Sequence, residues 1–146
     1  MKTQLFFVTA IFTLFLLLSG LASANTLDSP AKEKVESNLL VGVQSSNEGL
    51  KISSAFYLGE IKSEKGVNHL MKILREDSNP GARLMAALSL IKIEDPQGLY
   101  LVKRTAQFNS EERVRRMSDK LYYAYLINKY VEENPKEAPS FAVLKK

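Results

Sequence analysis

Few residues in this sequence are of a type that could carry out chemistry. His69 is the single histidine, and no carboxylate lies three or four residues from it, so a helix would bring it no second metal ligand. Cysteine is absent, which excludes thiol catalysis and zinc–thiolate sites. The sequence contains no Gly-rich phosphate loop and no Gly-x-Ser-x-Gly turn. We therefore expect no catalytic residue, no metal site and no cofactor, in a protein that is not an enzyme.

Two pairs of adjacent acids, Glu111-Glu112 and Glu132-Glu133, are the remaining candidates for acid–base chemistry. Neighbours in sequence point to different sides of a helix, which makes each a poor catalytic pair. Glu111 and Glu112 stand where a helix would begin, and the positive end of the helix dipole favours acids there. We interpret this pair as structural.

Three basic residues, Lys51, Arg83 and Arg115, recur at intervals of 32 residues. Such a series can pair with acids of the adjacent turns, for which Asp77 and Asp95 are candidates, and form an internal ladder. It can also bind a ligand, and the sequence leaves both interpretations open. Under either interpretation the spacing indicates a repeated structural element.

The repeat is visible when residues 47–61, NEGLKISSAFYLGEI, are aligned with residues 79–93, NPGARLMAALSLIKI. Asn47 and Asn79 fall at the same place, and each can cap a helix through its side-chain oxygen. Pro80 suits the first position of the second helix, where its missing N–H is not needed. Each copy therefore predicts an apolar helix that is covered on more than one side.

A second helix is predicted after each of these, over residues 62–76 and 94–108, which again align at an offset of 32. Ser63 and Asp95 are the expected caps. The repeated unit is therefore a pair of helices. Because Leu58 and Leu90 hold the same position in two units, we expect both to be buried between stacked pairs.

Helices are also predicted over residues 31–44 and 109–133, the latter beginning in the same register but with a changed face, as in a unit that closes a stack. The fold class is therefore all-α, a short right-handed α-solenoid of about three stacked helix pairs. We assign this domain to residues 25–134 and expect a loose C-terminal tail over 135–146.

The segment NPGARLMAALSL (79–90) resembles the first helix of a HEAT-type repeat in six residues: Asn79, Pro80, Arg83, Ala86, Ala87 and Leu90. The short period is similar to the compact HEAT-like units of phycobilisome lyases. The resemblance covers roughly residues 35–130 and implies a HEAT-like stack, a fold that serves many tasks. The His-Glu pairs of HEAT-like hydroxylases are absent, and nothing supports lyase or DNA-glycosylase activity.

The first 24 residues have the layout of a cleaved signal peptide. Lys2 is followed by an apolar run from Leu5 to Leu18, and Ala22 and Ala24 supply the small residues before a cleavage site. The run is short for a membrane span, although an uncleaved anchor is the alternative. We expect a bacterial protein that is periplasmic or secreted, with no stable membrane span after cleavage.

A basic, partly aromatic strip is predicted on the second helices. The apolar positions of 64–76 leave one face of that helix polar, and the same places recur one repeat later. The strip consists of Asn68, Lys72, Arg75, Tyr100, Lys103, Arg104 and Gln107. It is either a partner-binding surface or an ordinary solvated face.

The function that this sequence favours is that of a non-catalytic protein-binding or scaffold module outside the cytoplasm, whose partner is an acidic protein and not a nucleic acid. The formal net charge of +4 permits such a partner. The alternative is an accessory subunit that recognises an anionic envelope component. An enzyme comes third.

Overall fold

The computed structural model describes residues 29–135, so the expected signal peptide at 1–24 and all but the first residue of the expected tail lie outside it. Its helices are α2 (Ser29–Gly42), α3 (Glu48–Glu60), α4 (Val67–Glu76), α5 (Pro80–Ile93), α6 (Pro96–Phe108) and α7 (Glu112–Glu133), with a 3-10 turn, η1 (Glu64–Gly66), before α4. No strand occurs within the described residues. The chain divides into two compact units, Met1–Lys34 and Val35–Lys146, and the helix pairs lie in the second.

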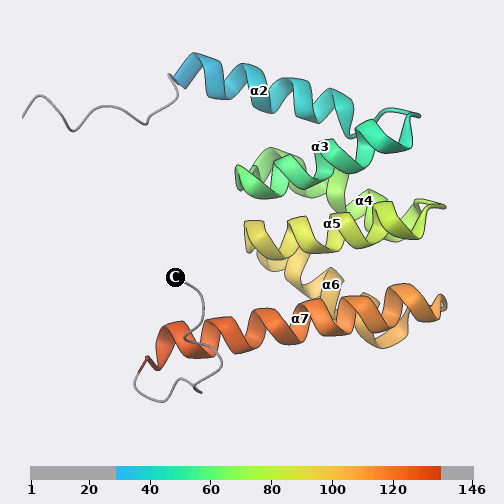
Figure 1. The fold of residues 1–146 in the computed structure, drawn as a ribbon, viewed down its shortest axis with the longest axis vertical. Helices are drawn as coiled ribbons and strands as arrows, with labels where there is room; N and C mark the ends of the chain where they lie inside the picture. The colour runs from blue at the N-terminus through green and yellow to red at the C-terminus, as the bar shows by residue number, and fades with distance from the viewer. Residues whose placement is uncertain (1–28, 136–146) are drawn as a thin grey trace, which may run out of the picture. The chain divides into compact units, whose positions relative to one another are not determined.

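The helices form two layers (Figure 1). The first helices of the units, α3, α5 and α7, lie side by side in one layer, and α4 and α6 lie behind them in the other. α5 contacts α3, α4, α6 and α7, so it is the centre of the stack. The prediction of an all-α solenoid is therefore confirmed.

The offset of 32 residues is repeated in the polar contacts of the turns. Ser45, Asp77 and Asn109 each accept a hydrogen bond from the backbone N–H two residues later, at 3.1, 2.8 and 3.0 Å. A short side chain with an acceptor oxygen fixes the chain reversal at this place before each first helix. The same turn therefore begins three successive units.

The predicted helix caps are also confirmed. Asn47 and Asn79 accept the N–H groups of the first turns of α3 and α5, at 3.0 Å from Leu50 N and 2.7 Å from Gly81 N. Ser63 caps the turn before α4, and its Oγ lies 3.1 Å from the N–H nitrogen of Gly66. Asp95 does the same for α6 at one repeat's distance.

Leu58 and Leu90 have no exposed surface, as predicted. Each packs against a glycine at the start of the following helix: a Cβ on Gly66 would lie 3.2 Å from Leu58 Cδ1, and one on Gly98 would lie 2.8 Å from Leu90 Cδ2. The glycines let the second helix of each pair approach the first. Leu50 departs from the expected apolar face, because it is 51% exposed.

Small residues bring α3 and α5 together. Ser89 Oγ donates a buried hydrogen bond of 2.7 Å to the carbonyl oxygen of Ala55. A Cβ placed on Gly59 would lie only 2.8 Å from Ser89 Cα, so the two backbones are in contact here. Ser54 and Ala86, two of the small residues that align between the units, are buried.

Candidate functional site

The basic series forms an internal ladder. Lys51 Nζ lies 2.6 Å from Asp77 Oδ2, and both side chains are largely buried. Arg83 Nε donates to the carbonyl oxygen of Leu74 at 3.1 Å, and its Nη1 lies 3.4 Å from Glu111 Oε2. In each case the basic side chain holds the turn that ends the preceding helix pair.

The ladder continues at the third position and corrects one expected partner. Arg115 Nη1 donates to the carbonyl oxygen of Asn109 at 3.3 Å. Asp95, a candidate acid in the sequence, is instead occupied as the N-cap of α6. The acid in its place is Glu111, and its pairing with Arg83 supports the structural interpretation of this glutamate. The ladder therefore explains these basic residues without a ligand.

The carboxyl of Asp77 is stabilised in its charged form. Burial acts to raise its pKa, but the hydrogen bond from Lys51, the backbone N–H of Asn79 and the charges of Lys51 and Arg83 together outweigh it. The net effect places the pKa of Asp77 below its usual value of 3.8. A carboxyl with a lowered folded-state pKa contributes stability above its unfolded pKa and loses it as the pH falls through the folded value.

We predict that Asp77→Asn lowers the free energy of unfolding by about 1 kcal/mol at pH 7, because Lys51 loses its counter-charge. Asn109 holds the equivalent turn, so the amide should preserve the bond to the N–H of Asn79. Wild type and variant should converge in stability as the pH falls below about 4. Urea titrations at pH 7, 5 and 3 test this, with the exposed Asp119→Asn as control. A constant difference across this range would contradict the assignment.

The basic residues of the first-helix layer are paired with the neighbouring unit. Lys62 Nζ lies 3.4 Å from Glu94 Oε1, and Lys92 forms an ion pair with Glu60. The Lys92 ammonium also lies 4.9 Å from the ring centre of Phe56. These charges therefore join one unit to the next and are not available as a set for a partner.

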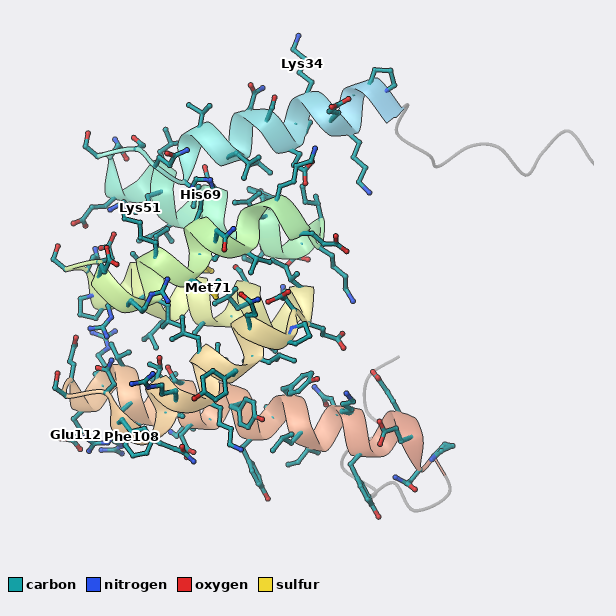
Figure 2. All side chains as sticks on the ribbon, turned by 180° about the vertical axis from the view of Figure 1, so that it is seen from behind. Lys34, Lys51, His69, Met71, Phe108 and Glu112 are labelled. Carbon is teal, nitrogen blue, oxygen red and sulfur yellow. The ribbon has the colours of Figure 1, made fainter. Side chains whose placement is uncertain are left out.

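The second-helix layer is different. Lys72, Arg75, Lys103 and Arg104 are all exposed, and within residues 29–135 none of them is paired with a carboxylate. α6, whose sequence is PQGLYLVKRTAQF, contains no acid at all. Figure 2 looks onto this side of the molecule, with His69 and Met71 on α4 and Phe108 at the end of α6. The unpaired positive charge of the stack therefore gathers on α4 and α6.

All seven residues of the predicted strip are exposed on α4 and α6, but they do not form one surface. Asn68 and Lys72 line a hollow of about 620 Å³ together with His69, next to the Lys51–Asp77 pair. The other five lie around α6. The strip is therefore divided between two places.

The larger group surrounds a groove between α4 and α6, which we call the α4–α6 groove. Its volume is about 430 Å³, and its lining consists of Met71, Arg75, Pro96, Gln97, Tyr100, Leu101 and Arg104. Arg75 comes from one helix, and Arg104 from the other. A hollow of about 660 Å³ continues along α6, lined by Tyr100, Lys103, Arg104, Gln107 and Phe108.

Sequence reasoning missed the apolar part of this site. Phe108 is 76% exposed, and Tyr100 is 65% exposed. Tyr100, Arg104 and Phe108 follow one another at intervals of four, a spacing that places them on one side of α6. That spacing was available in the sequence, but Phe108 was assigned only as the end of an aligned segment. The groove thus combines exposed aromatic rings with unpaired guanidinium groups.

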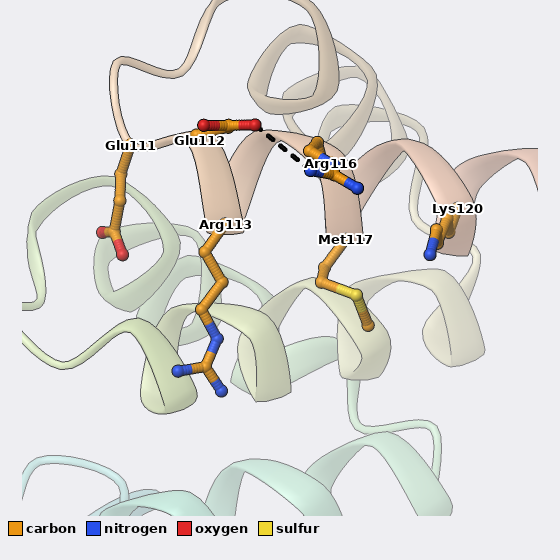
Figure 3. Close-up of a pocket in the computed structure, with 6 residues that line it drawn as sticks. All are labelled: Glu111, Glu112, Arg113, Arg116, Met117 and Lys120. Atoms are coloured by element: carbon orange, nitrogen blue, oxygen red, sulfur yellow. Dashed lines mark hydrogen bonds and ion pairs between the residues drawn. The ribbon is translucent and has the colours of Figure 1, made fainter.

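The adjacent acids at the start of α7 do not form a catalytic pair. Figure 3 shows the carboxylates of Glu111 and Glu112 pointing in different directions, and Glu112 Oε1 lies 3.2 Å from Arg116 Nη1. The surrounding hollow of about 510 Å³ also holds Arg113, Met117 and Lys120. Both glutamates have arginine partners, as expected for structural acids.

Two general searches of the described residues complete the description. Residues 29–135 contain no group of three or more His, Cys, Asp or Glu side chains placed to hold a metal ion. In the same range no helix has both the length and the apolar character that crossing a membrane requires.

Comparison with known proteins gives one match. The family model described as HEAT repeats matches residues 36–118, more than half of the chain. The match begins in α2 and ends in α7, so it includes both complete helix pairs and the α4–α6 groove. No curated protein sequence matches the chain.

Proposed function

The chain belongs to the HEAT-repeat family, whose members are commonly protein-interaction scaffolds, and we propose that it is a non-catalytic binding module that takes an acidic protein partner in the α4–α6 groove. The observation that carries the proposal is the separation of charge between the layers. Lysines of the first-helix layer pair with acids of the next unit, whereas the basic residues of α4 and α6 have no carboxylate partner within the described part of the chain.

The lining of the groove defines the partner more closely. Arg75 and Arg104 stand in its lining with Tyr100, and Met71 and Leu101 add apolar surface. Guanidinium groups bind carboxylates through two parallel hydrogen bonds, and exposed aromatic rings are frequent anchors of protein interfaces. The segment that fits is an acidic one with an apolar side chain between its carboxylates.

We predict that Arg75→Glu combined with Arg104→Glu weakens binding of such a segment at least tenfold, about 1.4 kcal/mol. The probes are two fluorescent peptides of equal negative charge, one with a leucine at the centre of a glutamate run and one with glycine there. Fluorescence anisotropy at low salt measures both. The leucine peptide should bind wild type more tightly, because the apolar lining contacts only that side chain.

The matched control is Arg113→Glu with Lys120→Glu, which makes the same change in net charge on exposed positions of α7. It should change the affinity less than threefold, and both double variants should keep the melting temperature of the wild type. Equal weakening by the two variants would mean that only net charge is sensed and that the groove is not the binding site.

We also propose that the module acts outside the cytoplasm of a bacterial cell. Support comes from the apolar run and the small residues at Ala22 and Ala24, which lie outside the described residues. Expression with the native leader should give an exported chain whose mass corresponds to a start at Asn25. An exported chain that still begins with Met1 would support the uncleaved anchor instead.

A further inference from the structure

The register of the stack identifies which side of α7 a further unit would cover. On α3 the residues that contact α5 or its cap are Glu48, Ala55, Phe56, Gly59 and Glu60. Counting 64 residues on gives the corresponding positions of α7: Glu112, Asp119, Lys120, Tyr123 and Ala124. We call this side the outer face of α7.

The outer face changes character along the helix. Its first half is charged, with Glu112, Asp119 and Lys120, which is how repeat proteins close a stack to further units. Its last half is apolar: Tyr123 is 64% exposed, and Leu126 and Tyr130 lie three and seven residues further on, at 45% and 50%. The charged half explains why the stack ends here, but the apolar half is left unexplained.

The apolar half also extends beyond the stack. α7 has 22 residues and α5 has 14, and the end of α5 at Ile93 corresponds to position 125 of α7. Figure 1 shows α7 running on past α5 in this direction. Leu126 and Tyr130 therefore lie on turns that have no counterpart in the unit before.

We propose that residues 141–144, Phe-Ala-Val-Leu, dock on the apolar half of the outer face of α7. They are four consecutive apolar residues between the end of α7 and the last two lysines. The helix ends just before them: the N–H of Asn134 donates to the carbonyl oxygen of Tyr130 at 2.9 Å, and Pro135 follows. A proline cannot continue the helix, so the chain can turn back along it.

The lengths agree with this occupant. Tyr123 and Pro135 are twelve residues apart, about 18 Å along a helix at 1.5 Å per residue. Phe141 is six residues beyond Pro135 and can reach about 20 Å in an extended chain. Phe141 can therefore contact any residue of the face from Tyr130 to Tyr123.

A short segment also fits better than a second copy of the molecule. A helix long enough to cover the apolar half would extend over Asp119 and Lys120 and remove their charges from water, at a cost in free energy. A four-residue segment covers only the apolar turns. Its attachment to α7 gives it a high effective concentration at the face.

Hydrogen exchange of the intact protein tests the docking. The variant Phe141→Ser with Leu144→Ser should speed exchange of the backbone amides of residues 126–133 about tenfold, because docking protects the end of α7 from fraying. The control Val41→Ser, an exposed apolar position on α2, should leave these rates unchanged. Equal rates in the double variant and the wild type would overturn the proposal.

Cross-linking identifies the occupant, since the chain has no cysteine of its own. Ile127→Cys with Ser140→Cys should form a disulfide within one chain under mild oxidation. Tyr57→Cys with Ser140→Cys, which places the first thiol on α3, should not. A disulfide found only between two chains would assign the face to a second copy, and no disulfide at all would leave the face to another protein. Either outcome overturns the proposal.

Discussion

Leu90→Ala is expected to lower the free energy of unfolding by about 2–5 kcal/mol, through the lost burial of the side chain and the cavity that remains. Leu90 has no exposed surface and lies on α5, the helix that contacts four others. Its side chain also fills the space against Gly98, where a second helix begins. The cavity would therefore open between two helices of one pair. The measurement is the midpoint of a urea titration at an unchanged m-value.

The control for this prediction is Leu50→Ala, the same substitution at a position of α3 that is 51% exposed. It should cost about 0.5 kcal/mol, as surface substitutions do. If the two variants had similar midpoints, Leu90 would not be part of the packed core, and the alignment of the units would be incorrect.

Gly59→Ala is expected to lower the free energy of unfolding by about 1–3 kcal/mol, although alanine favours a helix more than glycine does. The new methyl group would lie 2.8 Å from Ser89 Cα, an atom of the backbone that no rotamer change can move away. α3 and α5 would have to separate, and the hydrogen bond from Ser89 to Ala55 would stretch or break. Thermal and urea unfolding measure the effect.

Gly49→Ala is the matched control, because it makes the same change in the same helix. A Cβ at Gly49 meets only the side-chain oxygen of Asn47, at 3.4 Å. The substitution should be neutral or stabilise the protein by about 0.4–1 kcal/mol, since alanine restricts the unfolded chain. A loss of stability at both positions would show that the close approach of α3 and α5 is not the cause.

The fold could be predicted from the sequence because the signals that set it are local and occur twice. Asn47 and Asn79 cap helices through short side chains acting within three residues, and the structure shows those bonds where the alignment placed them. Burial was predicted less well on the exposed side of α3. Leu50 was expected on the apolar face, yet it lies in the first turn of α3 and remains half exposed.

The candidate site was predicted in its residues but not in its geometry. Periodicity placed Arg75 and Arg104 on exposed faces of two helices, and both are exposed. It could not show that the two line one groove while Lys72 belongs to another hollow, because that depends on how α4 and α6 pack. The partner of Arg83 was missed for the same reason: Glu111 lies 28 residues away in sequence.

The 32-residue register also determines how the molecule can assemble from the unfolded chain. Among the described residues, the side-chain hydrogen bonds that join one helix pair to the next span between 26 and 34 residues, from Lys51–Asp77 to Ser89–Ala55. No loop longer than one unit has to close before these bonds form, and folding rates rise as contacts become more local in sequence. Assembly can start at any pair and add neighbours one at a time, as in a one-dimensional chain of coupled elements. Unfolding would then proceed from the ends of the stack, and the amides of α5, at its centre, would be the last to exchange with solvent.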